Sequence, residues 1–177
     1  MCIRDRAYAD SLMDVNQDSA RAALAMLDSL KAKNPKMSKG QWMHYELVYA
    51  KGMNKAFVDF TTDSVMKEVV AYYDNHGSAN DRMLAYYLLG CVYRDLKDSP
   101  ACLDWYNKAT ECADTTSVDC NYEQLAIIYG QIGSIFLDQE MPQNALRALE
   151  KTKEYAQINV SGSAFIPCII QKSSNSI

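Results

Sequence analysis

The sequence contains few of the residues that interrupt helices, with 7 glycines and 4 prolines in 177 residues. This low content excludes collagen-like and low-complexity chains. Hydrophobic residues make up 49% of the chain and charged residues 23%, so it can bury a core rather than stay disordered. We therefore expect one folded domain or a short array of repeats.

An excess of positive charge is also lacking, since 18 Lys and Arg face 22 Asp and Glu for a net charge of −4. Proteins that bind nucleic acid or anionic lipid through charge present a basic face. We therefore expect no nucleic-acid partner. No run approaches the roughly 20 apolar residues that span a bilayer, so we expect no membrane insertion.

Motifs that carry chemistry are absent as well. There is no glycine-rich phosphate loop, no H-E-x-x-H and no G-x-S-x-G, and the six cysteines lack zinc-site spacing. We expect no enzyme activity, no metal and no cofactor; a helical enzyme with dispersed catalytic residues is the less favoured alternative. Cys112 and Cys120 flank a polar stretch and are either free thiols or, in an oxidising compartment, a disulfide.

The two ends of the chain differ from its middle. Residues 1–6 resemble translated sequencing adapter, so we interpret them as a non-native start. Residues 158–177 hold five isoleucines, as many as the preceding 157 residues together, and we leave this tail unassigned. The expected domain is 7–157.

Apolar residues recur at spacings of three and four, and no segment alternates as a strand does. We therefore expect an all-α fold. Asn80 is expected as a helix N-cap, and Pro142 in a first helical turn. The predicted helices are 17–32, 40–57, 63–76, 80–96, 100–113, 121–139 and 142–157.

The chain repeats itself at an offset of 43 residues. Four residues on one helical face recur at the same spacing: Tyr86, Leu89, Gly90 and Tyr93 as Tyr129, Ile132, Gly133 and Phe136. The following helices also correspond, with Cys102, Tyr106 and Ala109 aligned to Ala145, Leu149 and Thr152. The glycines allow two antiparallel helices to approach closely. We therefore expect all these residues except Thr152 to define the core of a repeated helix pair.

The pattern Y-x2-L-G-x2-Y followed by C-x3-Y-x2-A resembles the tetratricopeptide repeat (TPR) pattern W-x2-L-G-x2-Y…A-x3-F. The family's period is about 34 residues, so the extra residues between the units are placed in a polar loop, 114–122. The resemblance implies a right-handed α–α superhelix of antiparallel helix pairs. Its units are 83–113 and 126–156, a divergent unit 42–76 and a half unit 17–32.

In this family the first helix of each pair lines a concave groove. The resemblance therefore implies a noncatalytic scaffold that binds a protein or peptide of unknown identity. Some members of this family bind the C-terminal carboxylate of a peptide through Lys, Asn and Arg side chains in the groove. This sequence lacks that set, because Tyr87, Cys91 and Gln131 occupy the comparable places. The implied groove residues are Tyr87, Leu88, Cys91, Arg94, Gln131, Ser134 and Asp138, together with Leu84 and Ile127.

Residues 63–98 further resemble the repeat regions of large TPR proteins from gut anaerobic bacteria, which commonly carry an export or lipoprotein signal and a signalling or DNA-binding part. This resemblance implies an exported or lipid-anchored intact protein, whereas free cysteines favour the cytoplasm. The alternative function is a sensor or oligomerisation segment of a longer signalling or transcription protein. An array end without a polar cap also exposes apolar surface, through which a homodimer could form.

Overall fold

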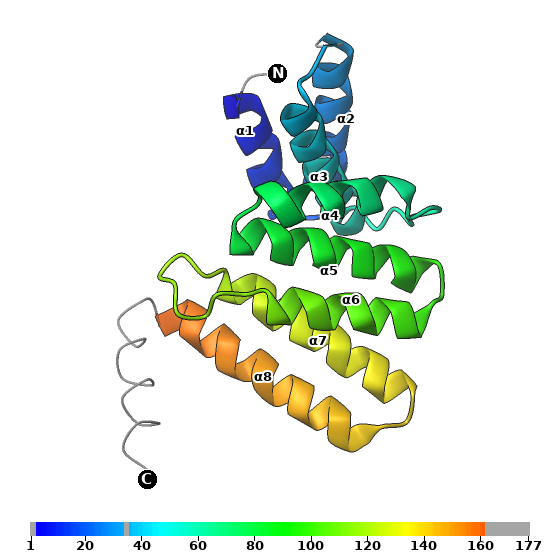
Figure 1. Ribbon diagram of the computed structural model, residues 1–177, viewed down its shortest axis with the longest axis vertical. Helices are drawn as coiled ribbons and strands as arrows, with labels where there is room; N and C mark the ends of the chain where they lie inside the picture. Colours follow the sequence, from blue (N-terminus) through cyan, green and yellow to red (C-terminus); the bar gives the residue numbers. More distant parts are fainter. Residues whose placement is uncertain (1–2, 34–35, 162–177) are drawn as a thin grey trace.

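The computed structural model describes residues 3–33 and 36–161, which are all-α and contain no strand. The all-α expectation is therefore confirmed. The helices follow one another along the long axis of the molecule (Figure 1). They are α1 Ile3–Met13, α2 Gln17–Lys33, α3 Lys39–Lys55, α4 Ser64–His76, α5 Ala79–Asp95, α6 Ser99–Glu111, α7 Tyr122–Asp138 and α8 Pro142–Ser161.

The seven predicted helices are all present, and α1 is a further helix that the sequence pattern does not predict. This helix is held by Ala9 and Met13, which are 0% and 1% exposed and belong to one apolar cluster with α2 and α3. Two anchors one turn apart are too few to stand out as a periodic pattern. At the other end, α8 continues to Ser161, past the expected boundary at 157; residues 162–177 of the expected tail lie outside the described part.

Helices pack mainly on their neighbours in the chain. The principal contacts join consecutive helices, and α1–α3 and α3–α5 add contacts between helices two apart. Three-residue connections join α5 to α6 and α7 to α8, so each of these pairs folds back on itself. The core is thus built from successive helix layers.

The helices α3, α5 and α7 share a common register. Each has 17 residues, and the twelfth is Ala50, Gly90 or Gly133, all buried. A Cβ at Gly90 would overlap the ring of Tyr106 in α6, and one at Gly133 would lie 3.2 Å from Leu149 Cδ2 in α8. A small residue at this position therefore lets the following helix pack closely.

The expected core residues divide into three groups. Leu89, Gly90, Cys102, Tyr106, Ala109, Ile132, Gly133 and Ala145 are buried. Tyr86, Tyr93, Tyr129 and Phe136 are half-buried against the core. Two of these place their hydroxyls at its edge, where Tyr86 donates to Asp74 at 2.6 Å and Tyr93 to Asp63 at 2.8 Å. Leu149 differs from the expectation because it is 42% exposed: among the described residues, no further helix covers the outer face of α8.

Three helix ends share a strained backbone conformation. Phe57, Lys97 and Glu140, which follow the C-caps of α3, α5 and α7, have φ of 54°, 64° and 58°. The next amide closes the helix in each case: Val58 N donates to Met53 O at 3.0 Å, and Asp98 N to Tyr93 O at 2.9 Å. This is the Schellman arrangement, in which glycine is the usual residue.

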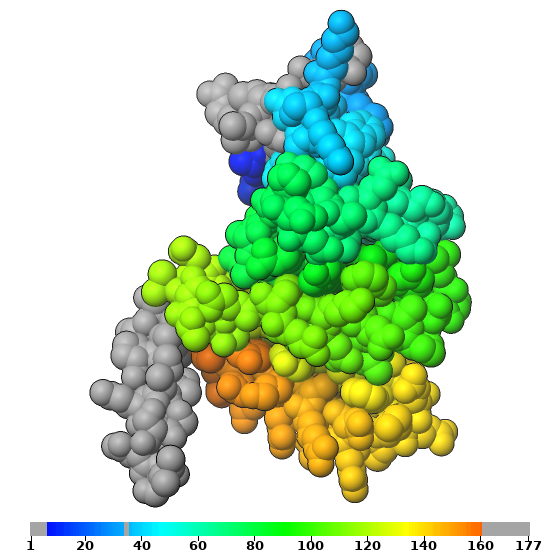
Figure 2. Space-filling model, viewed as in Figure 1, coloured from blue at the N-terminus to red at the C-terminus, as the bar shows by residue number. Residues whose placement is uncertain are grey.

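The connection between α6 and α7 is the longest loop among the described residues, 112–121, close to the predicted 114–122. It projects to one side of the molecule (Figure 2). The loop is tied to the start of α5 by Asn80, whose Nδ2 donates to Asp119 O at 2.7 Å and whose Oδ1 accepts from Asn121 N at 3.1 Å. Asn80 is therefore not the N-cap of α5. That role belongs to Ser78, which forms a capping box with Asp81.

Within 3–33 and 36–161, no helix combines the length and apolar character required to span a bilayer.

Candidate functional site

A cavity of about 640 Å³ lies along α3, α5 and α7, the helices that share a register. It begins at the carboxyl end of α3 and the loop after it, follows α5, and reaches the first half of α7. The lining residues are Asp14, Lys51, Asn54, Lys55, Phe57, Asp59, Leu84, Tyr87, Leu88, Arg94, Asp95, Asn121, Glu123, Gln124, Ile127 and Gln131.

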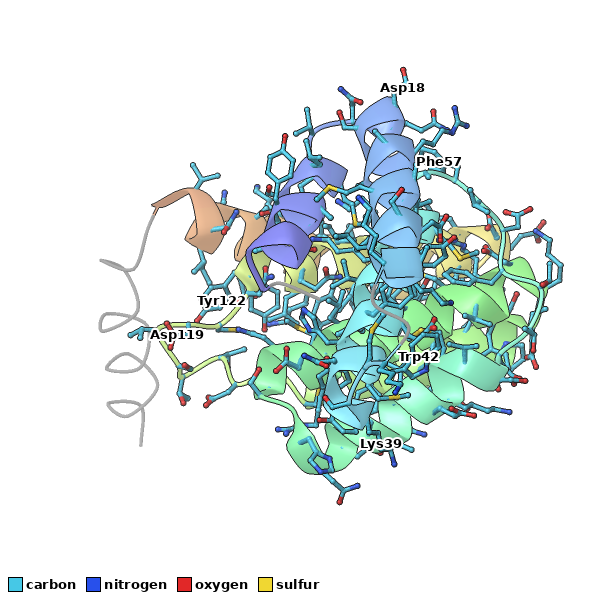
Figure 3. All side chains as sticks on the ribbon, turned by 90° about the horizontal axis from the view of Figure 1, so that it is seen from above. Asp18, Lys39, Trp42, Phe57, Asp119 and Tyr122 are labelled. Carbon is cyan, nitrogen blue, oxygen red and sulfur yellow. The ribbon has the colours of Figure 1, made fainter. Side chains whose placement is uncertain are left out.

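The cavity has two ends of different construction. Phe57 and Tyr122 are well separated in the view from above (Figure 3). Phe57 marks the end formed by α3 and the loop that follows it, while Tyr122 starts the α7 segment that lines the other end. Between them, Leu84 and Ile127 supply apolar surface. We call this cavity the groove.

Arg94 connects α5 to α3 at the first end of the groove. Its guanidinium donates to Asp95 Oδ1 at 2.9 Å through Nε and at 2.8 Å through Nη2, and to Asn54 Oδ1 at 3.2 Å. Asp95 also accepts from the backbone amide of Phe60 at 3.1 Å. Asn54 in turn donates to the Tyr87 hydroxyl at 3.4 Å. The polar groups on this wall are therefore held in fixed positions by one network.

The two lysines of the groove are also engaged within the chain. Lys51 Nζ lies 2.9 Å from Asp10 and 2.9 Å from Asp14, and Lys55 lies 3.2 Å from Asp14. Burial lowers the pKa of Lys51, but the hydrogen bonds to the two carboxylates outweigh this effect and leave its pKa above the usual value. Lys51 therefore stays charged and paired at neutral pH.

Tyr87 lies at the base of the groove and is 6% exposed. Its ring stacks on Tyr106 with centroids 5.6 Å apart. Burial is the main cause that raises the pKa of its hydroxyl above the usual value for tyrosine. The hydroxyl is therefore neutral at physiological pH and serves as a hydrogen-bonding group.

The structure brings together four of the seven expected groove residues: Tyr87, Leu88, Arg94 and Gln131 line the cavity. Cys91 does not, because it is 0% exposed and its Sγ lies 3.5 Å from the Tyr106 hydroxyl, on the side of α5 that faces α6. Leu88 is also 0% exposed, so it forms part of the floor beneath the accessible wall. Ser134 and Asp138 are exposed on α7 beyond the groove.

Several lining residues were missed by sequence reasoning, among them Lys51, Asn54, Phe57, Asp59, Glu123 and Gln124. Two of them had a usable signal. Counting back 40 residues from Cys91 and Arg94 gives Lys51 and Asn54, the thirteenth and sixteenth residues of α3. Extending the groove positions from α5 to α3 in this register would therefore have found both. Phe57 and Asp59 belong to a loop, where a helical register gives no information.

The cysteines of the described residues form no disulfide. Cys91, Cys102, Cys112 and Cys120 are free, so Cys112 and Cys120 are not bridged in this structure. Burial raises the pKa of Cys102 and of Cys112 to about 11, so both are protonated thiols at neutral pH. The residues for which the structure gives positions contain no group of three His, Cys, Asp or Glu that could hold a metal ion.

Comparison with known proteins found no match to a family model, to a curated protein or to a solved structure.

Proposed function

We propose that this chain is a noncatalytic scaffold that binds a protein or peptide segment in the groove of a TPR-like right-handed superhelix. Support for the repeat comes from the register of α3, α5 and α7, with equal length and a small residue at the twelfth position of each. The three Schellman ends at Phe57, Lys97 and Glu140 repeat at the same place in each helix.

The observation that carries the proposal is the groove itself, which is lined by the first helix of three successive pairs. Its walls combine apolar surface with hydrogen-bonding side chains held in place by the Arg94–Asn54–Tyr87 network. Sites that bind chain segments commonly combine apolar anchoring with fixed polar groups. The groove runs from Leu84 to Asp95 along α5, which is about 16 Å at 1.5 Å per helical residue.

Selection from a random peptide library on the immobilised full chain tests this function. We expect groove-dependent sequences to be enriched, and their binding to be lost in Ile127→Arg, which places a charged side chain on the apolar wall. The matched control is Val65→Arg on α4, where the valine is 46% exposed and does not line the groove. Thermal unfolding of both variants checks that the fold is retained. If no sequence is enriched, or if both variants bind equally, the groove is not the binding site.

A second candidate function, oligomerisation within a longer regulatory protein, is favoured by the outer face of α8. Leu146 and Leu149 are 59% and 42% exposed and lie three residues apart, on the same helical face. An exposed apolar face at the end of a helix array is suited to pairing with another copy.

A further inference from the structure

The basic residues of the groove have partners within the chain, whereas some of its acidic residues do not. Its three basic residues, Lys51, Lys55 and Arg94, are each paired with an Asp of the same chain. Two of its carboxylates, Asp59 and Glu123, are exposed and have no ion-pair or hydrogen-bond partner among the described residues. The groove therefore presents unneutralised negative charge and no spare positive charge.

These two carboxylates lie toward opposite ends of the groove. Asp59 follows α3, at the end where Arg94 and Asn54 meet, whereas Glu123 is in the first turn of α7. The apolar residues Leu84 and Ile127 line the wall between these ends. A ligand that matches this order has a positive charge, an apolar side chain and a second positive charge.

Each end offers a second contact to such a ligand. Phe57 is 78% exposed, lines the groove two residues before Asp59, and holds its ring there despite a φ of 54°. An aromatic face attracts a lysine or arginine side chain. Near Glu123, the Nε2 of Gln124 is buried without a hydrogen-bond partner among the described atoms. Gln124 itself is partly exposed and lines the groove, so rotation of its amide presents this donor to a ligand carbonyl oxygen.

We infer that the occupant of the groove is an extended peptide segment with the pattern basic–x–apolar–x–basic, its basic side chains pairing with Asp59 and Glu123. This inference rests on the proposed function. Side chains at alternate positions of an extended chain point to the same side, and its first and fifth residues lie about 13 Å apart at roughly 3.3 Å per residue. The long basic side chains at these two positions cover the rest of the groove's extent along α5.

Three blocked pentapeptides test the inference with the full chain. They are the basic Lys-Ser-Leu-Ser-Lys, the neutral Gln-Ser-Leu-Ser-Gln and the acidic Glu-Ser-Leu-Ser-Glu, each with a fluorophore, measured by fluorescence anisotropy at low salt. We expect the basic peptide to bind most tightly and the acidic peptide most weakly. Asp59→Asn and Glu123→Gln should each weaken binding of the basic peptide by about three- to tenfold, in the range of exposed charge pairs, and leave the neutral peptide unchanged. Added salt should reduce the difference between peptides.

Asp104→Asn, an exposed carboxylate on α6 outside the groove, is the matched control and should leave all three affinities unchanged. The neutral or acidic peptide could bind as tightly as the basic peptide or more tightly, with this binding lost in Ile127→Arg. That result would overturn the proposed charge pattern but leave the groove as the binding site. If no pentapeptide binds but the library still yields groove-dependent sequences, the inference again fails alone. If neither experiment detects binding, the proposed function fails with it.

Discussion

Two glycines, one in α5 and one in α7, differ in how much space the surrounding atoms leave for a side chain. Gly90 in α5 is buried against the ring of Tyr106, which is itself 0% exposed and cannot move into solvent. Gly130 in α7 has more room, since a Cβ there would meet Thr152 Oγ1 at 3.8 Å, an ordinary contact. Only Gly90 is therefore required for the approach of the following helix.

We predict opposite effects when each glycine is replaced by alanine. Gly90→Ala should lower the free energy of unfolding by about 1–3 kcal/mol, because the Tyr106 ring is displaced in a packed core. Gly130→Ala should raise it by up to about 1 kcal/mol, because alanine favours the helix. Urea unfolding monitored by circular dichroism measures both. Two destabilising substitutions of similar size would contradict the assigned packing.

For single residues, the sequence predicts the close contact between paired helices better than it predicts which side chains line the groove. The recurrence of Gly90 and Gly133 carried information about packing because a small residue is needed there in each pair. The recurrence does not predict to which side of α5 the Cys91 side chain points. It is near Tyr87 and Arg94 on the helical wheel, but only the packed structure shows that the Tyr106 ring of α6 covers it.

Among the elements, the ends of α3, α5 and α7 have the same geometry built from unlike residues. Left-handed backbone costs a residue with a Cβ about 1–2 kcal/mol. Phe57, Lys97 and Glu140 all adopt it, and the Schellman hydrogen bonds that follow hold the chain in place. Lys97 and Glu140 do not line the groove, so glycine can replace them without altering it.

Lys97→Gly should therefore raise the free energy of unfolding by about 0.5–1 kcal/mol, since the relief of strain exceeds the entropy that glycine adds to the unfolded chain. Lys97→Ala is the control, because alanine keeps the Cβ and the strain. Thermal unfolding of the two variants and the wild type measures the difference. Equal stability of the glycine and alanine variants would show that the backbone here is not strained.

The extent to which elements could be predicted depended on how many buried positions each one has. Helix α5 buries Met83, Ala85 and all six residues from Tyr87 to Val92, and its boundaries were predicted to within a residue. Helix α1 has two buried residues among those whose burial is described, 7–13, and it was not predicted. The loop that carries Phe57 and Asp59 has no periodic pattern. Its contribution to the groove therefore could not be predicted from the sequence.

At the level of the whole molecule, the outer face of α8 is covered by no other helix of residues 3–33 and 36–161. Leu146 and Leu149 are 59% and 42% exposed there, whereas Tyr106, the α6 residue aligned with Leu149, is 0% exposed. We predict that the full chain forms a homodimer through this face. Sedimentation velocity at rising concentration should show a species of twice the 19.9 kDa chain mass.

The double substitution Leu146→Glu and Leu149→Glu should return the protein to the monomer, because four carboxylates would then meet across a symmetric interface. Val118→Glu is the control: this valine is 76% exposed on the loop between α6 and α7, and its replacement should leave the dimer intact. A wild-type chain that stays monomeric at all concentrations would exclude the dimer.

The local nature of the helix contacts has a consequence for how the chain reaches its native state. Because each helix touches mainly those one or two positions away, few contacts require distant parts of the chain to meet. Proteins with such low contact order fold quickly, and amino-terminal units can form while the rest is still being synthesised. The groove, which needs α3, α5 and α7 together, is then completed only when α7 emerges and docks on α6, so binding competence would appear as a late and separate kinetic phase.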